Sequence, residues 1–158
     1  MNRRTALLLS LSAAALAARP SLAALAEGPF PLTRSQAEWR ALLTEAQYDV
    51  LRDAETERPY SSPLNDEARD GIYHCQGCDQ AVYDAADKYD SGTGWPSFTR
   101  SLDGAIGTME DRSFIFQVRT ECHCSRCGSH LGHIFDDGPA PTGKRHCLNG
   151  VALRFQPV

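Results

Sequence analysis

The chain has 158 residues and a formal charge of −4, from 16 basic and 20 acidic side chains. Residues 27–158 hold 13 of the basic side chains and all 20 acidic ones, so this part alone carries −7. An acidic domain is a poor match to a phosphate backbone, which argues against nucleic-acid binding. Twelve Gly and nine Pro exclude a collagen-like or low-complexity chain, and 42% hydrophobic residues are enough to build a core.

The first 26 residues predict a secretory signal peptide. Met1–Arg4 is basic, residues 5–18 are uncharged and mostly apolar, and Ala24–Ala26 fits an A-x-A cleavage site. The pair Arg3–Arg4 is compatible with twin-arginine export. The apolar run is shorter than the roughly 20 residues that span a bilayer, which disfavours the alternative, an uncleaved anchor helix. We therefore expect an exported, periplasmic domain over residues 27–158, with no stable membrane insertion after cleavage.

Two helix signals open this domain. Ser35–Glu38 and Thr44–Gln47 each have the pattern of a capping box, in which the first and fourth side chains bond to each other's backbone amides. Apolar residues follow both boxes at helical spacing. The pattern predicts short helices over residues 35–43 and 45–53.

Short strands and loops are predicted for the rest of the chain. The expected strands cover residues 71–75, 81–83, 112–122 and 145–155, the last as one strand or a pair, and loops cover 91–98 and 136–143. Alternation in 112–122 predicts a half-buried strand, with Phe114, Phe116, Val118, Thr120 and Cys122 on one face and Gln117, Arg119 and Glu121 on the other. The fold class is α+β and mainly antiparallel β.

Four of the six cysteines form two C-x-x-C knuckles, Cys75–Cys78 and Cys124–Cys127. Four thiolates from two such knuckles make a closed tetrahedral Zn²⁺ site, which predicts a structural rather than a catalytic metal. The 45 residues between the knuckles exceed a zinc-ribbon gap, so the metal would join two distant hairpins. The alternative for six cysteines in an exported chain is three disulfides.

Cys122 and Cys147 remain after this assignment. Cys147 is flanked by Arg145 and His146, and a nearby cation favours the nucleophilic thiolate. His130 and His133 lie shortly upstream; at a spacing of three they come together in a turn but face opposite ways in a regular strand. These residues indicate a thiol enzyme with a histidine acid or base. The alternative is a small buried cysteine and hydrogen-bonded histidines.

Several blocks occur together in a fixed order. They are the two knuckles, Gly94-Trp-Pro-Ser-Phe98, His130-Leu-Gly-His133-Ile-Phe135, Asp137-Gly-Pro139, Pro141-Thr-Gly143 and Arg145-His-Cys-Leu-Asn149. This set, from about Ser35 to Phe155, resembles the B-type methionine sulfoxide reductases, which reduce the R epimer of methionine sulfoxide in proteins. The resemblance implies a β-tent of two small antiparallel sheets, with N-terminal helices and a structural zinc far from the active centre.

The resemblance also implies a role for each matching residue. Cys147 would attack the sulfoxide sulfur and retain the oxygen as a sulfenic acid. His130 and His133 would protonate that oxygen, Asn149 and Arg145 would orient the network, and Trp95 and Phe135 would hold the substrate methyl group. The implied partners are oxidised proteins and a thioredoxin-like reductant, and we expect a monomer.

Three positions depart from the common pattern of that family. Thr93 stands where many members have the cysteine that resolves the sulfenic acid, His146 stands for Tyr, and Gly150 stands for Ser. Either an external thiol reduces Cys147 directly, or Cys122 resolves it. Two other classes stay open from the residues: a zinc-stapled binding module that has lost catalysis, and a disulfide-framed secreted domain.

Overall fold

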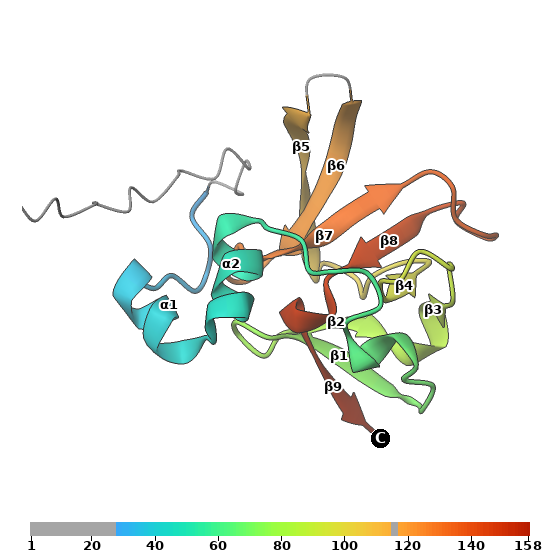
Figure 1. Cartoon of the computed structure of the whole chain (residues 1–158), viewed down its shortest axis with the longest axis horizontal. Helices are drawn as coiled ribbons and strands as arrows, with labels where there is room; N and C mark the ends of the chain where they lie inside the picture. Colours follow the sequence, from blue (N-terminus) through green and yellow to red (C-terminus); the bar gives the residue numbers. More distant parts are fainter. Residues whose placement is uncertain (1–27, 115–116) are drawn as a thin grey trace, which may run out of the picture.

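The computed structural model describes residues 28–114 and 117–158, which form two helices, three short 3₁₀ helices and nine strands (Figure 1). The helices are α1 (Gln36–Leu42), α2 (Glu45–Asp53), η1 (Pro63–Asn65), η2 (Ala85–Asp87) and η3 (Gly150–Ala152). The strands are β1 (Gly71–Cys75), β2 (Ala81–Asp84), β3 (Lys88–Tyr89), β4 (Ser97–Phe98), β5 (Ile106–Phe114), β6 (Gln117–Cys124), β7 (His130–Phe135), β8 (Arg145–Leu148) and β9 (Leu153–Pro157).

The proposed signal peptide, residues 1–26, lies outside the described residues. Among the described helices, none is long and apolar enough to cross a bilayer.

The strands form two antiparallel sheets. One has the order β2-β1-β9 and the other the order β3-β4-β8-β7-β6-β5. β8 belongs to the larger sheet and β9 to the smaller one, so the chain crosses between the sheets at η3. The α+β, mainly antiparallel class is confirmed; the tent-like arrangement of the sheets stays a prediction.

Both capping boxes are present. The Ser35 and Thr44 hydroxyls accept from the backbone amides of Glu38 and Gln47, whose side chains accept in return from the cap amides. In Figure 1 the two helices lie together at one side of the sheets. Arg52, at the end of α2, donates to the carbonyl oxygen of Cys127 at 3.2 Å, so the helices pack beside the second knuckle.

The core lies between the two sheets. Tyr73 of β1 and Tyr83 of β2 come from the smaller sheet and Phe98 from the larger one, and all three are fully buried. The Phe98 ring centroid is 4.9 Å from that of Tyr73 and 4.7 Å from that of Tyr83. Aromatic packing of this kind holds the sheets face to face.

Two details of the predicted strands were wrong. Residues 97–98, expected in a loop, form β4, because they pair with β3 and β8. The expected single strand 112–122 spans parts of β5 and β6, which pair as a hairpin. The predicted alternation holds for Glu121 and Cys122, which lie on opposite faces, but burial does not follow polarity: Val118 is 53% exposed and Glu121 is 2% exposed. The outer ends of β5 and β6 project beyond the other strands (Figure 1), and within β6 only residues 121–124 are buried.

Candidate active site

Strand register brings Cys147 and His133 together. β8 lies between β4 and β7, where Cys147 pairs with Ser97 on one side and with His133 on the other. Directly paired residues in an antiparallel sheet point to the same face. Next to them is a cavity of about 150 Å³. Its lining residues are Thr56, Trp95, Arg119, Gly132, His133, Phe135, Cys147, Leu148 and Asn149.

A β-bulge decides the relation between the two histidines. The pairing of β6 with β7 runs from Cys122–Gly132 to His123–His130, so Leu131 is an extra residue on β7. An extra residue shifts the alternation by one. His130 and His133, three apart in sequence, therefore share a face, and their ring centroids are 5.3 Å apart. This settles the alternative that the spacing left open: the two imidazoles meet within an irregular strand.

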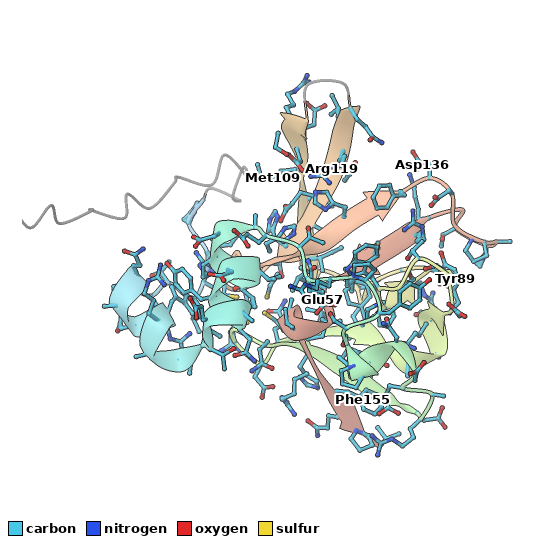
Figure 2. The ribbon with its side chains drawn as sticks, viewed as in Figure 1. Glu57, Tyr89, Met109, Arg119, Asp136 and Phe155 are labelled. Atoms are coloured by element: carbon cyan, nitrogen blue, oxygen red, sulfur yellow. The ribbon has the colours of Figure 1, made fainter. Side chains whose placement is uncertain are left out.

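Each histidine is anchored by a buried carboxylate from the β5–β6 hairpin. His130 Nδ1 is 2.7 Å from Glu121 Oε1, and His133 Nε2 is 2.8 Å from Asp111 Oδ2. Asp111 also accepts from Arg119, which lies on β6 beside the cavity (Figure 2). Burial alone would raise the pKa of Asp111, but its hydrogen bonds hold that pKa well below the usual range.

The His133 imidazole is neutral in this setting. Burial lowers its pKa below the usual value, and the hydrogen bond to Asp111 offsets only part of this effect. Because an ionised carboxylate only accepts, Nε2 of His133 carries the proton and Nδ1 keeps its lone pair. His133 is therefore able to accept a proton at the edge of the cavity.

The Cys147 thiol is half-buried, and its pKa reflects opposing influences. Burial raises the pKa of this thiol above its usual value, while the Arg145 guanidinium and hydrogen bonds from Thr93 and Arg145 lower it in part. The resting cysteine therefore holds its proton at neutral pH. Reaction through the thiolate needs a base nearby, and His133 lines the same cavity.

Two partners hold Arg145 in place. Its guanidinium donates to both carboxylate oxygens of Asp137 at 2.8 Å each, and it lies over the Phe135 ring, 4.3 Å from the centroid. Bidentate pairing and ring stacking use the planar shape that Arg has and Lys lacks. The cation beside Cys147 is thus in a defined orientation.

Glu57 forms hydrogen bonds with Trp95 and Asn149, two of the predicted site residues. Its carbonyl oxygen accepts from the Trp95 indole at 3.2 Å, and its amide donates to Asn149 Oδ1 at 3.0 Å. Its carboxylate accepts from the amides of Gly150 and Val151 at the start of η3. Figure 2 labels Glu57 near η3. Asn149 also donates to the carbonyl of Leu131. These bonds place Trp95 and Asn149 at the cavity.

Cys122 and His146 lie on the other face of the large sheet. Cys122 pairs with Gly132, one register position away from the His133–Cys147 pair, and it is fully buried. His146 is buried and its Nδ1 is 3.0 Å from the Tyr83 hydroxyl. Burial lowers the pKa of His146 to about 4, so it is neutral and belongs to the core.

The four knuckle cysteines form one cluster. Their sulfur atoms all lie within 4.8 Å of one another; Cys75 and Cys127 are 3.8 Å apart, and Cys78 and Cys124 are 3.5 Å apart. Four thiolates about 2.3 Å from one tetrahedral ion would be about 3.8 Å apart, so the geometry fits a metal. All six cysteines are unpaired, and so the three-disulfide framework does not occur.

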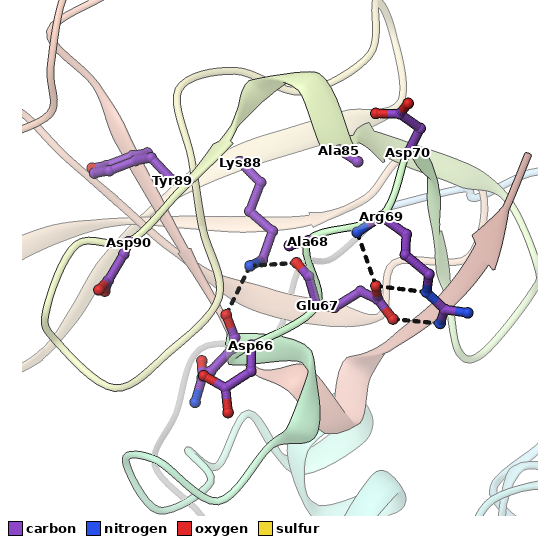
Figure 3. A pocket seen from close by; sticks show the side chains of 10 residues that line it. Asp66, Glu67, Ala68, Arg69, Asp70, Ala85, Lys88, Tyr89 and Asp90 are labelled. Carbon is purple, nitrogen blue, oxygen red and sulfur yellow. Dashed lines mark hydrogen bonds and ion pairs between the residues drawn. The ribbon is translucent and has the colours of Figure 1, made fainter.

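A second cavity of about 340 Å³ has no cysteine and no histidine in its lining. It is formed by residues 65–70, 85 and 88–90. Figure 3 shows that the Lys88 ammonium is held there by the backbone carbonyls of Asn65 and Glu67, at 2.8 and 3.0 Å. The Glu67 carboxylate is paired with Arg69. The smaller cavity at Cys147 is therefore the candidate active site.

The comparisons with known proteins agree with this geometry. The SelR domain model matches residues 43–157. The chain belongs to the MsrB family of peptide methionine sulfoxide reductases. A protein of that name from Methanosarcina barkeri is 47% identical over 123 residues, 78% of this chain and 87% of that protein. A protein of the same name from Pseudomonas putida strain GB-1 is 50% identical over 76% of this chain and 92% of that protein. Another from Leifsonia xyli is 46% identical over 83% of this chain and 95% of that protein.

Sequence reasoning missed four residues of this MsrB site. They are Glu57, Asp111, Arg119 and Glu121. Arg119 and Glu121 were assigned to the face of a strand opposite its apolar residues, because polar residues alternating with apolar ones usually face solvent. Glu57 and Asp111 carried no local signal. The one local signal was the pair of charged residues Arg119 and Glu121, which lie in a predicted strand shortly before Cys124 of the second knuckle.

We predict that Arg145→Met raises the pKa of the Cys147 thiol further, since it removes the cation that opposes burial. Alkylation of Cys147 by iodoacetamide at pH 7 should slow about tenfold, with its midpoint moved to higher pH. The measurement is the alkylation rate against pH, followed by peptide mass. Lys144→Met removes an exposed charge one residue away and should leave the rate unchanged. An unchanged rate in Arg145→Met would contradict the assigned influence of the guanidinium.

Proposed function

We propose that this MsrB-family protein reduces the R epimer of methionine sulfoxide in oxidised proteins, with Cys147 as the nucleophile. Reduction of peptide methionine sulfoxide is the activity named for its relatives. The observation that carries the proposal is one cavity lined by a cysteine thiol, an imidazole and two aromatic side chains, Trp95 and Phe135. A binding module that had lost catalysis would not need these groups together.

The proposed reaction follows from the protonation states. The Cys147 sulfur attacks the sulfoxide sulfur while the thiol proton passes, by way of the imidazoles, to the sulfoxide oxygen. Cys–SH and R₂S=O become Cys–SOH and R₂S, so sulfur of the substrate is reduced and the cysteine sulfur is oxidised. Protonation makes the oxygen transferable, which explains why a histidine base must lie beside a thiol of raised pKa.

The cavity walls provide the basis for choosing one epimer. Trp95 and Phe135 form an apolar surface suited to the methyl group, since sulfur-bound methyl groups pack well on aromatic rings. His133 and Asn149 form the polar side. When the methyl group contacts the aromatic wall and the oxygen contacts the polar wall, only one epimer of methionine sulfoxide directs its sulfur atom toward Cys147.

For recycling, we propose that a thioredoxin-like dithiol reduces the Cys147 sulfenic acid directly and releases water and a disulfide on the reductant. Thr93, at the position of the usual resolving cysteine, hydrogen-bonds to the Cys147 sulfur but cannot form a disulfide. Cys122, the other candidate resolving residue, is fully buried on the opposite face of the sheet. A Cys122–Cys147 disulfide would require the sheet to open.

An assay with peptides that carry R- or S-methionine sulfoxide tests the reaction and the recycling. Wild-type protein should reduce only the R form, and Cys147→Ser should lose all activity because the nucleophile is gone. Cys122→Ala should keep multiple turnovers with thioredoxin. Activity on the S form, or activity of Cys147→Ser, would refute the proposed chemistry. One turnover followed by arrest in Cys122→Ala would identify Cys122 as the resolving cysteine.

We propose that the four-thiol cluster, Cys75, Cys78, Cys124 and Cys127, holds a structural Zn²⁺. All four tetrahedral positions are taken by protein sulfur, so the ion would act as a cross-link between the two knuckles. The catalytic steps above use no metal. An all-thiolate tetrahedral donor set suits zinc, and closed sites of four cysteines are typical of structural zinc.

Substitution of one ligand tests the metal. Cys78→Ser should lose about one equivalent of zinc and melt at a much lower temperature, because metal binding contributes directly to folding. The measurements are metal content by plasma mass spectrometry and thermal unfolding by circular dichroism. Cys147→Ser, a matched change outside the cluster, should keep its zinc and its melting temperature. A Cys78→Ser protein with full stability would contradict a structural metal.

We propose that the domain works as an exported monomer in the bacterial periplasm, on oxidised proteins and not on nucleic acid. The support is the signal-like segment 1–26 and the negative charge of residues 27–158. Amino-terminal sequencing of the protein from a periplasmic fraction should begin at Glu27. Recovery of the uncleaved chain with the membrane fraction would contradict export as a free domain.

A further inference from the structure

Glu121 lies between two imidazoles inside the large sheet. Its side chain is 2% exposed, with Oε1 2.7 Å from His130 Nδ1 and Oε2 2.9 Å from His123 Nδ1. Strand register pairs Glu121 with His133, and His133 with Cys147. The carboxylate therefore belongs to the face of the sheet that carries the nucleophile.

The protonation state of this group follows from its two contacts. Burial would raise the pKa of Glu121, but the hydrogen bonds from His123 and His130 hold it below the usual value. An ionised carboxylate accepts and never donates. Both imidazoles therefore donate Nδ1–H to Glu121. In neutral His130 this leaves the lone pair on Nε2.

Nε2 of His130 has no such partner among the described residues. The ring is 1% exposed, and Nε2 is a buried atom without a hydrogen bond to any described group. Buried polar atoms are nearly always paired, and an exception calls for an explanation. The ring stands edge-on to His133, 5.3 Å between centroids, and His133 lines the cavity. The His130 ring thus lies next to a residue of the candidate active site.

We propose that Glu121 is the positioning residue for His130: it fixes the Nδ1–H tautomer and the ring orientation, so that Nε2 is the atom through which His130 passes a proton to the sulfoxide oxygen. This inference rests on the proposed function. In the reaction above, the thiol proton must leave sulfur and reach oxygen. Because Nδ1 of His130 already donates to Glu121, Nε2 is the nitrogen of His130 that is able to accept that proton from the sulfur or from His133, and the adjacent carboxylate stabilises the imidazolium that forms.

Glutamine is the informative substitution. A carboxylate accepts at both oxygens, but an amide has one oxygen and one NH₂ group. In Glu121→Gln one of the two histidines must therefore accept at Nδ1, which moves its proton to Nε2, or lose its bond. Size and shape are kept, but the negative charge that stabilises the His130 imidazolium is lost whichever histidine keeps its hydrogen bond, so slower proton transfer is the specific consequence expected.

Two measurements on the full, metal-loaded chain test the proposal. Nitrogen-15 NMR of the wild-type imidazoles should show His130 protonated at Nδ1 and not at Nε2 when neutral. With an R-methionine sulfoxide peptide, Glu121→Gln should lower kcat at least about tenfold while KM stays within about twofold, because transfer of the proton rather than binding is affected. The matched control is Glu110→Gln, an exposed position on β5, which should keep both constants.

Each other outcome overturns the proposal. A wild-type spectrum with the Nε2–H tautomer of His130 does so even if the variant fails to fold. A folded Glu121→Gln protein with a lower melting temperature and unchanged kcat would show that the carboxylate serves only packing. If the wild type reduces no methionine sulfoxide at all, the proposed function fails, whereas the tautomer of His130 is still read from the spectrum.

Discussion

The four-thiol cluster is the constraint on which the arrangement of the two sheets depends. Cys75 ends β1 of the small sheet, and Cys124 ends β6 of the large one. Their sulfur atoms meet in one cluster, which joins hairpins about 45 residues apart in the chain. The ion proposed for this cluster would join these distant segments and remove much of the freedom of the unfolded chain. The same ion would fix the end of β6, and β6 pairs through β7 with β8, the strand that carries Cys147.

The active-site face of the large sheet is unusual because it buries charge. Asp111 and Glu121 are each less than 5% exposed. A buried carboxylate costs several kcal/mol unless its oxygens are hydrogen-bonded. Here His and Arg side chains donate to both carboxylates, and the Ser113 amide donates to Asp111 as well. Such a network is rigid when all its members are present. It orients two imidazoles that a β-sheet alone would leave free to rotate.

Alternation along β8 separates the reactive residue from the structural one. Cys147 and His146 are neighbours in sequence but lie on opposite faces. The cavity face carries the thiol, with Thr93 and Arg145 near its sulfur. The core face carries His146, bonded to Tyr83 and kept neutral by burial. A His in place of the usual Tyr at position 146 therefore changes the packing of the core rather than the chemistry at sulfur.

The sequence by itself determined the local features. Capping boxes specify helix starts through contacts three residues apart, and both helices were placed within a residue of their observed bounds. Knuckle spacing predicted the cysteine cluster, because the four ligands must reach one ion. The ordered motifs around Trp95, His130 and Cys147 were enough to identify the family, and the cavity contains most of the residues they named.

Only the tertiary structure decided which polar residues reach the site. The bulge at Leu131, which turns His130 and His133 to one face, arises from pairing with β6 and leaves no trace in the local pattern. The burial of Glu121 and the exposure of Val118 were not predicted, because period-two alternation does not reveal where a hairpin leaves the core. Glu57, Asp111 and Glu121 take part through contacts to residues distant in sequence or across strands. Burial and strand register, which depend on the whole fold, set those contacts.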